Sequence, residues 1–188
     1  MKKHVLGISG SPRRNGNTEI LLDKALKGAA SKGAQTEKFI LNEMRFKACQ
    51  ECGGCRYTGI CVVDDDMKLI YEKIGRADVV ILSSPIFFGS ISAQLKAMID
   101  RFQCAWAAKY LLKRPPPSVK KSGAFISAGG SDKEAFFENA KQIIKIFFIT
   151  LNIKYTKDLF FDKVEEKAEI LKNKAALEAA YDLGRSLI

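Results

Sequence analysis

The sequence predicts an α/β protein: a doubly wound, five-stranded parallel sheet in the order 2-1-3-4-5, with helices on both faces. Two observations predict this fold. Apolar strand patterns alternate with amphipathic helix patterns along the chain, which is typical of a parallel sheet covered on both faces. The segment ADVVILSSP (77–85) is almost continuously apolar, as expected for a strand buried on both sides. With 188 residues, 47% of them hydrophobic, the chain fits a single domain, 1–188.

The elements follow one another in order. The first strand ends in a Gly-Ser-Pro loop at 10–12, Asn17 or Thr18 can cap the next helix, and Gly33 ends it. Three acidic residues open the helix at 64–75, where they suit the helix dipole. The expected strands cover residues 3–9, 34–43, 77–85, 122–130 and 153–161. The expected helices cover 17–33, 64–75, 91–112, 131–151 and 164–188, with 114–121 as a stiff, proline-rich connector.

The strand order indicates where a ligand binds. In such sheets, ligands lie at the carboxyl ends of the strands, where the topology switches between strands one and three. The loops that meet there are 9–18, 83–92 and 127–131. A cysteine-rich loop at about 47–63 follows strand two and opens on the same edge.

The charge and hydropathy restrict the partners. The net charge is +10, from 31 Lys and Arg against 21 Asp and Glu. This fits either a solvated lysine-rich surface or docking of an acidic partner. No nucleic-acid motif accompanies the densest basic region, 109–121, so we expect no nucleic-acid partner. No secretory signal or membrane-spanning stretch is evident, so we expect a cytoplasmic protein without structural disulfides.

The first loop, GISGSPRRNGNT (7–18), is suited to binding an anion. Backbone amides at the helix start can converge there with polar side chains. The loop is neither GxGxxG nor a Walker A motif, because Asn17 stands where the lysine would be. A terminal monophosphate therefore fits better than a triphosphate with magnesium, and an ordinary Ser/Gly/Asn turn is the alternative. The polar side chains available are those of Ser9, Ser11, Arg13, Asn17 and Thr18.

Together with SSPIFFGSISAQLKAMIDR (83–101), this loop resembles the flavodoxin-like, NADPH-dependent FMN reductase family. The resemblance implies that the first loop binds the FMN phosphate and that the two later loops lie against the isoalloxazine ring. It also implies a homodimer or homotetramer whose subunit faces complete each flavin pocket. From the residues alone, simple core packing is the better explanation for either Phe87 or Phe88 taken singly. The implied FMN-binding residues are Ser9, Ser11, Pro12, Arg13, Asn15, Asn17, Thr18, Pro85, Ile86, Phe87, Phe88, Gly89, Ser127, Gly129 and Gly130.

Four cysteines form the most crowded motif in the chain. The four cysteines have the spacing C-x2-C-x2-C-x5-C: Cys49, Cys52, Cys55 and Cys61. This spacing is typical of iron–sulfur ligands, whereas zinc sites usually have two CxxC pairs that are well separated. Zinc, free thiols and a redox disulfide remain open. The motif beside FMN loops resembles the iron–sulfur flavoproteins, which implies a [4Fe–4S] cluster on these four cysteines at the FMN edge. Cys104 lies in an apolar helix and is expected to be a buried packing residue.

The sequence thus predicts an FMN-dependent redox flavoprotein. It would pass electrons between a reduced donor, either a ferredoxin-like acidic protein or NAD(P)H, and a small acceptor. No catalytic Ser–His or His–Asp arrangement is evident, and His4 lies at the far end of strand one. The alternatives are an NAD(P)H-dependent FMN or quinone reductase without a cluster, an electron carrier, and a zinc-stabilised binding module.

Overall fold

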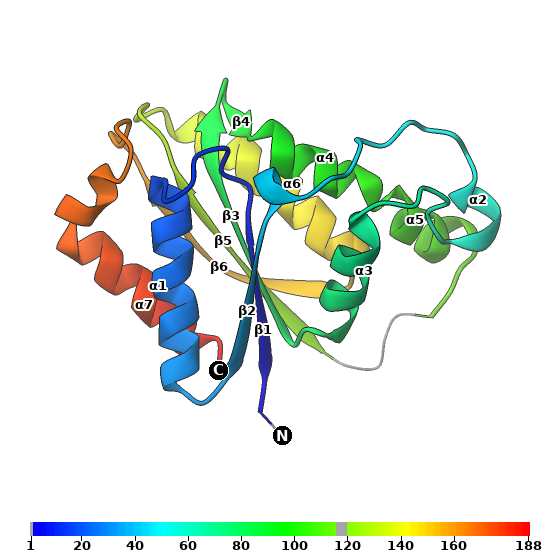
Figure 1. Ribbon diagram of the computed structural model, residues 1–188, viewed down its shortest axis with the longest axis horizontal. Helices are drawn as coiled ribbons and strands as arrows, with labels where there is room; N and C mark the ends of the chain where they lie inside the picture. The colour runs from blue at the N-terminus through cyan, green and yellow to red at the C-terminus, as the bar shows by residue number, and fades with distance from the viewer. Residues whose placement is uncertain (1, 116–119) are drawn as a thin grey trace.

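Figure 1 shows a computed structural model of the protein, which describes residues 2–115 and 120–188. The described residues form a six-stranded sheet in the order β2-β1-β3-β5-β6, with a short β4 paired to β3. The five main strands are parallel, so their order is the expected 2-1-3-4-5. The strands are β1 (His4–Ser9), β2 (Gln35–Ile40), β3 (Val79–Phe87), β4 (Ser90–Ile91), β5 (Lys121–Ala128) and β6 (Ile153–Phe161).

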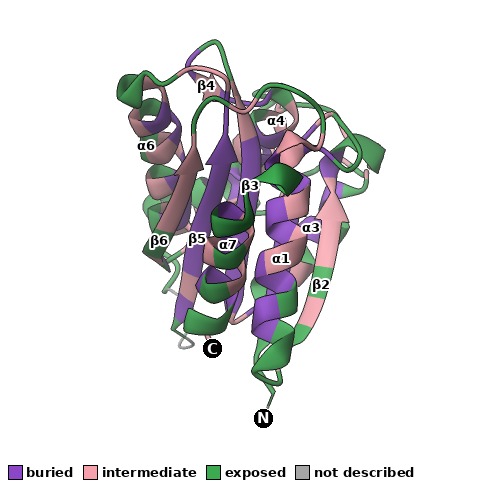
Figure 2. Ribbon diagram, turned by 90° about the vertical axis from the view of Figure 1, so that its left-hand side faces the viewer, coloured by how far each residue is buried: buried purple, intermediate pink, exposed green. Residues whose placement is uncertain are grey.

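Helices cover both faces of the sheet, as expected (Figures 1 and 2). Side chains alternate along each buried strand. In β1, Leu6 and Ile8 belong to one core, and Val5 belongs to the other. The first core packs against α3 (Met67–Arg76), α4 (Ala93–Arg101) and α6 (Glu134–Thr150). The second packs against α1 (Asn17–Ser31) and α7 (Lys174–Ser186), which Figure 2 shows in front of the sheet.

Two glycines allow α1 and α7 to pack closely. A Cβ atom on Gly28 would lie 2.0 Å from the carbonyl oxygen of Tyr181, and one on Gly184 would lie 1.8 Å from that of Ala25. Neither position has room for a methyl group. This contact holds α1 in place, and the amino end of α1 forms the end of the first loop.

The loop expected at 83–92 is a β-hairpin. Strand β3 continues through Pro85 to Phe87 and then pairs antiparallel with β4. The two turn residues, Phe88 and Gly89, have φ angles of 49° and 71°. Two-residue hairpin turns with positive φ at both positions match the right-handed twist of the strands. An aromatic residue rarely adopts this conformation.

The prediction of one long helix at 91–112 was wrong. Helix α4 begins after Ser92, whose side chain accepts a hydrogen bond from the backbone NH of Leu95, and it ends at Arg101. After Phe102 the chain forms the short α5 (Gln103–Trp106) and then a π-helical turn, η2 (Ala107–Leu111). The apolar pattern continues through the break at Phe102, so the sequence pattern could not reveal the break.

The prediction of a closing helix from residue 164 was also wrong at its start. Helix α7 begins at Lys174, where the side chain of Asn173 accepts a hydrogen bond from the NH of Ala176. Residues 162–173 form a loop with a 3₁₀ turn, η3 (Glu169–Lys172).

Smaller boundaries also differ. Strand β2 ends at Ile40 and leads into a 3₁₀ turn, η1 (Leu41–Glu43). Gly16, and neither Asn17 nor Thr18, is the N-cap residue of α1. Residues 116–119, half of the expected connector at 114–121, lie outside the described residues. Within the described part of the chain, no helix combines the length and the apolar character that crossing a bilayer would need.

Candidate functional site

A cavity of about 380 Å³ lies at the carboxyl edge of the sheet, between the first loop, the end of β3 and the loop after β5. These are the three segments that the sequence placed at the switch point. We call it the first-loop cavity. Ten of the fifteen expected FMN-binding residues line it: Ser11, Pro12, Arg13, Asn17, Thr18, Pro85, Ile86, Phe87, Gly129 and Gly130.

The other five expected residues do not line this cavity. Ser9 and Ser127 are fully buried in their strands. Asn15 is exposed, and its backbone NH donates to the carboxylate of Glu19. The ring of Phe88 is fully exposed at the hairpin tip. The carbonyl of Gly89 accepts a hydrogen bond from Asn139, which ties the hairpin to α6.

The first loop is held by a buried carboxylate. Glu19, in the first turn of α1, is only 1% exposed and accepts from the NH of Asn15 at 2.8 Å. It forms ion pairs of 2.6 Å with Arg14 and 3.0 Å with Lys38. Within the loop, the Ser11 hydroxyl accepts from the NH of Arg13 at 3.1 Å. The loop conformation is therefore fixed by its own side chains.

Three buried hydroxyls lie beneath this loop. Those of Ser9, Thr18 and Ser83 have no hydrogen-bond partner in the described part of the chain. Ser9 and Ser83 are neighbours across β1 and β3, and Thr18 lies in the first turn of α1. Buried polar groups without partners are rare, and phosphate oxygens at a helix amino end would supply acceptors. Of the three, only Thr18 lines the first-loop cavity, and its hydroxyl, with the amides at the start of α1, fits the phosphate of FMN.

The sequence did not predict that residues 164–167 line this cavity. Arg13 Nη1 donates to the Glu165 carbonyl at 3.2 Å, and Asn17 Nδ2 donates to the Glu166 carbonyl at 2.9 Å. Asn17 Oδ1 also accepts from the NH of Ile170. Two expected phosphate ligands are thus bonded to a segment about 150 residues away. No local pattern could show this contact, although Asn173 as an N-cap indicates a loop before α7.

A second cavity, of about 630 Å³, is lined by Cys49, Cys52, Cys55 and Cys61. We call it the cysteine cavity. The chain passes through the short α2 (Cys55–Thr58) and turns back at Gly59, whose φ is 68°. All five cysteines are free thiols. Among the described residues, no three Cys, His, Asp or Glu side chains are grouped closely enough to hold a metal ion.

Cys104 also lines the cysteine cavity. It is buried, as the sequence predicted, and its thiol lies 3.5 Å from the carbonyl oxygen of Arg101. It comes from α5, outside the motif. Cys104 is therefore a core residue with one side toward the cavity.

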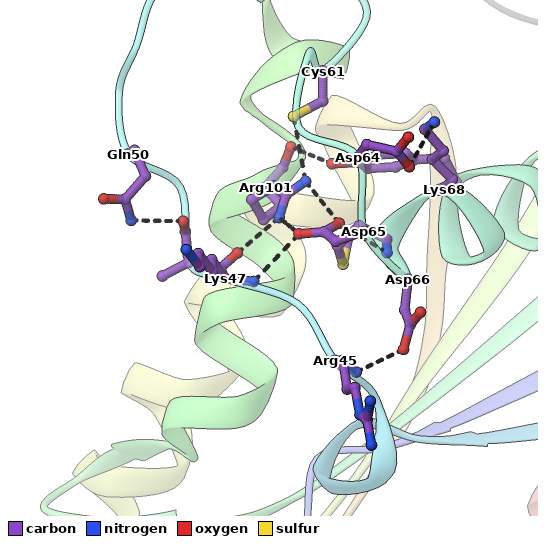
Figure 3. Close-up of polar contacts among 12 residues, drawn as sticks. Arg45, Lys47, Gln50, Cys61, Asp64, Asp65, Asp66, Lys68 and Arg101 are labelled. Carbon is purple, nitrogen blue, oxygen red and sulfur yellow. Dashed lines mark hydrogen bonds and ion pairs between the residues drawn. The ribbon is translucent and has the colours of Figure 1, made fainter.

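Arg101, the last residue of α4, joins the two ends of residues 47–65, which we call the cysteine segment (Figure 3). Its Nη1 donates to Asp65 Oδ2 at 2.5 Å and to the Lys47 carbonyl at 2.8 Å. Its Nη2 donates to Asp65 Oδ1 at 3.1 Å and to Cys61 Sγ at 3.4 Å. Lys47 precedes the motif, and Asp65 follows it. No pattern in the sequence indicates this role, because an arginine near a helix end is usually exposed.

The electrostatics of the cavity favour a thiolate at Cys61. Burial alone would raise the pKa of this thiol, but the backbone at Val63 and the guanidinium of Arg101 outweigh burial and hold the pKa below its ordinary value. Burial, together with the charges of the other three motif thiols, raises the pKa of Cys55. Burial also opposes the charge on Asp65, yet the hydrogen bond from Arg101 leaves its pKa below the usual range.

Helix α4 connects the two cavities. At its start, the Ser92 hydroxyl donates to the carbonyl of Gly10 in the first loop at 2.6 Å. At its end, Arg101 lines the cysteine cavity. Nine helical residues span about 14 Å at a rise of 1.5 Å each. One rigid element therefore sets the distance between the two sites.

Comparisons with known proteins agree with this arrangement. Residues 3–162 match the model of the NADPH-dependent FMN reductase family. An iron–sulfur flavoprotein of Methanosarcina thermophila is 41% identical over 68% of this chain and 63% of that protein. One of Archaeoglobus fulgidus is 37% identical over 77% of this chain and 71% of that protein. The chain thus matches just under two thirds of the first relative's length.

Solved structures show the same fold. An NAD(P)H:quinone oxidoreductase from Methanothermobacter marburgensis superposes with a TM-score of 0.79, covering 100% of this chain and 96% of that one. The two are 18% identical, so this likeness shows the fold alone. The family match covers most of the chain and includes both the first loop and the cysteine motif. This chain therefore belongs to the iron–sulfur flavoprotein and NADPH-dependent FMN reductase family.

Proposed function

We propose that this chain is an FMN-dependent oxidoreductase that holds a [4Fe–4S] cluster and passes electrons between a reduced donor and a small acceptor. One observation carries the proposal: the four motif thiols line a single cavity, joined by α4 to a second cavity built from the FMN-type loops. The donor is a ferredoxin-like protein or NAD(P)H. The setting is the cytoplasm, where thiols stay reduced.

The residues of the first-loop cavity would hold FMN. The amides and hydroxyls at the start of α1 bind its phosphate. The segments Pro85–Phe87 and Gly129–Gly130, which line the same cavity, would lie beside its ring. FMN, when bound, accepts two electrons together and releases them singly. The protein itself supplies orientation and electrostatics.

The cysteine cavity fits a cluster in its chemistry. Thiolates are the usual ligands of iron–sulfur clusters, and Arg101 already favours the thiolate at Cys61. Since the thiols are not grouped at ligand distance, binding requires the segment to close around the cluster. Gly53 and Gly59, both with positive φ, permit such a turn. The four motif thiolates would hold the cluster, which would supply one-electron redox chemistry.

The test is the content of anaerobically prepared protein. We expect FMN, iron and sulfide in the ratio of one FMN to four iron and four sulfide per chain, with no zinc. Cys52→Ala should abolish iron and sulfide but leave FMN bound, because the flavin loops lie elsewhere in the chain. Cys104→Ala is the matched control and should retain both groups, because Cys104 lies outside the motif.

Other outcomes would change the assignment. Protein with FMN but neither iron nor sulfide would refute the cluster and favour a plain NAD(P)H-dependent FMN or quinone reductase. Zinc in place of iron would favour a structural metal site. Gel filtration with light scattering tests the proposed homodimer or homotetramer, which a monomeric holoprotein would exclude.

A further inference from the structure

Arg101 links the two ends of the cysteine segment. Its side chain is only 1% exposed, yet it contacts both ends of the segment at once. It reaches the carbonyl of Lys47, two residues before Cys49, and the carboxylate of Asp65, four residues after Cys61. A single side chain from α4 therefore holds together the two ends of the loop that supplies all four motif cysteines.

The guanidinium also lies directly against a motif sulfur. Its Nη2 is 3.4 Å from Cys61 Sγ. Its Nε is buried and has no hydrogen-bond partner among the described residues, which leaves one donor unused on a side chain that lines the cavity. A buried donor without a partner is costly. An additional acceptor in the cavity, such as a cluster sulfur, would remove this cost.

The positive and negative charges around the cysteine cavity should have opposite effects on the reduction potential of a cluster. Four thiolates and a [4Fe–4S] core carry net negative charge, and each added electron increases it. A buried positive charge and N–H···S hydrogen bonds stabilise the reduced form and raise the reduction potential. A nearby carboxylate does the reverse. Arg101 and Asp65 form an ion pair at this site, so they should influence the potential in opposite directions.

We propose that Arg101 is a positioning residue for the cluster. Arg101 holds the two ends of the cysteine segment together, and its charge and its hydrogen bond to Cys61 raise the reduction potential of the cluster. This inference rests on the proposed cluster. It concerns residues that lie outside the four-cysteine motif and explains why a fully buried arginine ends α4.

The test compares the cluster potentials of the wild type, Arg101→Gln and Asp65→Asn, titrated anaerobically and followed by electron paramagnetic resonance. We expect Arg101→Gln to disfavour reduction by roughly tenfold, which is 59 mV for one electron. Asp65→Asn should shift the potential upward, because it leaves the guanidinium without its counter-charge. A purely structural role for the pair would shift both variants in the same direction or neither.

Two further variants complete the design. Arg101→Lys keeps the charge but cannot bridge the three partners, so the potential should stay close to that of the wild type while iron content falls. Arg114→Gln is the matched control: Arg114 donates to the carbonyl of Thr58 in the same segment and is exposed, so its loss should leave the potential unchanged. If Arg101→Gln holds no cluster, the Asp65→Asn and Arg101→Lys results decide.

The outcomes separate this inference from the proposed function. Wild-type protein without iron and sulfide overturns both. Wild-type protein with a cluster whose potential is the same in Arg101→Gln and Asp65→Asn overturns only the role of Arg101. A shift in Arg114→Gln equal to that in Arg101→Gln would also overturn it, because surface charge alone would then explain the effect.

Discussion

The hydroxyl of Ser92 donates a 2.6 Å hydrogen bond to the carbonyl of Gly10. This bond joins the first loop to the amino end of α4, and the same helix ends at Arg101 beside Cys61. Gly10 also donates its NH to the carbonyl of Ser83, at 2.8 Å. These hydrogen bonds therefore connect the first loop, β3 and α4. A substitution in one cavity can be compared with its effect on the other cavity.

Arg13→Glu should weaken FMN binding. Arg13 lines the first-loop cavity, and the substitution places a negative charge where the phosphate would bind. A hydrogen bond to a charged group contributes about 1.5–3 kcal/mol, so we expect Kd to rise roughly ten- to hundredfold. Fluorescence titration of the apoprotein measures this.

Two controls make the Arg13 result specific. Arg76→Glu introduces the same change on the exposed end of α3 and should leave Kd unchanged. Riboflavin, which lacks the phosphate, should bind more weakly than FMN to the wild type and should hardly respond to Arg13→Glu. Equal FMN affinity in Arg13→Glu and wild type would sink the phosphate assignment.

The net charge of +10 should accelerate electron transfer from an acidic protein. Attraction between separate proteins is screened as ionic strength rises, since the Debye length falls to about 8 Å at physiological salt. Reduction by an acidic ferredoxin-type protein should therefore slow steeply with salt in stopped-flow experiments. Reduction by a small uncharged reductant should hardly change. If both rates respond alike, the positive charge is only a solvated surface.

Asp65 should make the protein sensitive to acid. Its folded-state pKa lies below its ordinary value, because the hydrogen bond from Arg101 outweighs burial. A depressed carboxyl pKa contributes stability above the unfolded-state pKa, about 3.9, and this stability is lost as pH falls through the lower folded-state value. Denaturant unfolding of the apoprotein between pH 6 and pH 2 would measure the slope.

Asp65→Asn should flatten that slope and lower stability at neutral pH. Removing one partner of a buried ion pair costs about 3–5 kcal/mol, because the remaining charge is left uncompensated. Lys68 and Asp64 form an exposed pair in the same region, and Asp64→Asn is the control, with an expected loss of at most about 1 kcal/mol. An unchanged acid slope in Asp65→Asn would contradict the prediction.

Gly28→Ala and Gly184→Ala should destabilise the fold although alanine is the better helix former. Each added methyl would overlap backbone atoms, at 2.0 Å and 1.8 Å. Overpacking costs about 1–3 kcal/mol, which exceeds the gain in helix propensity of about 1 kcal/mol. Gly75, in α3, has no neighbouring atoms within 4 Å of the same added methyl, so Gly75→Ala should stabilise the protein slightly. Thermal unfolding distinguishes these opposite signs.

Local patterns were sufficient for the fold and for the approximate location of both sites. The almost continuously apolar run at 77–85 predicted a strand that is buried on both faces of a parallel sheet. It forms most of β3, the central strand. The first loop and the Gly129–Gly130 loop meet in one cavity, since the carboxyl ends of parallel strands share an edge. The cysteine spacing likewise brought four thiols to one cavity, because they lie within thirteen residues of one another.

The sequence by itself determined the sheet order, through the alternation of strands and helices, and it located the two loops and the motif, whose residues lie close together in the chain. Only the tertiary structure decided that Glu165 and Glu166 meet Arg13 and Asn17, that Phe88 points outward, and that Arg101 closes the cysteine segment. These contacts join residues far apart in sequence or depend on a break in a helix whose apolar pattern continues. Burial and hydrogen bonds between distant parts of the folded chain stabilise these contacts, so the local periodicity of the sequence does not predict them.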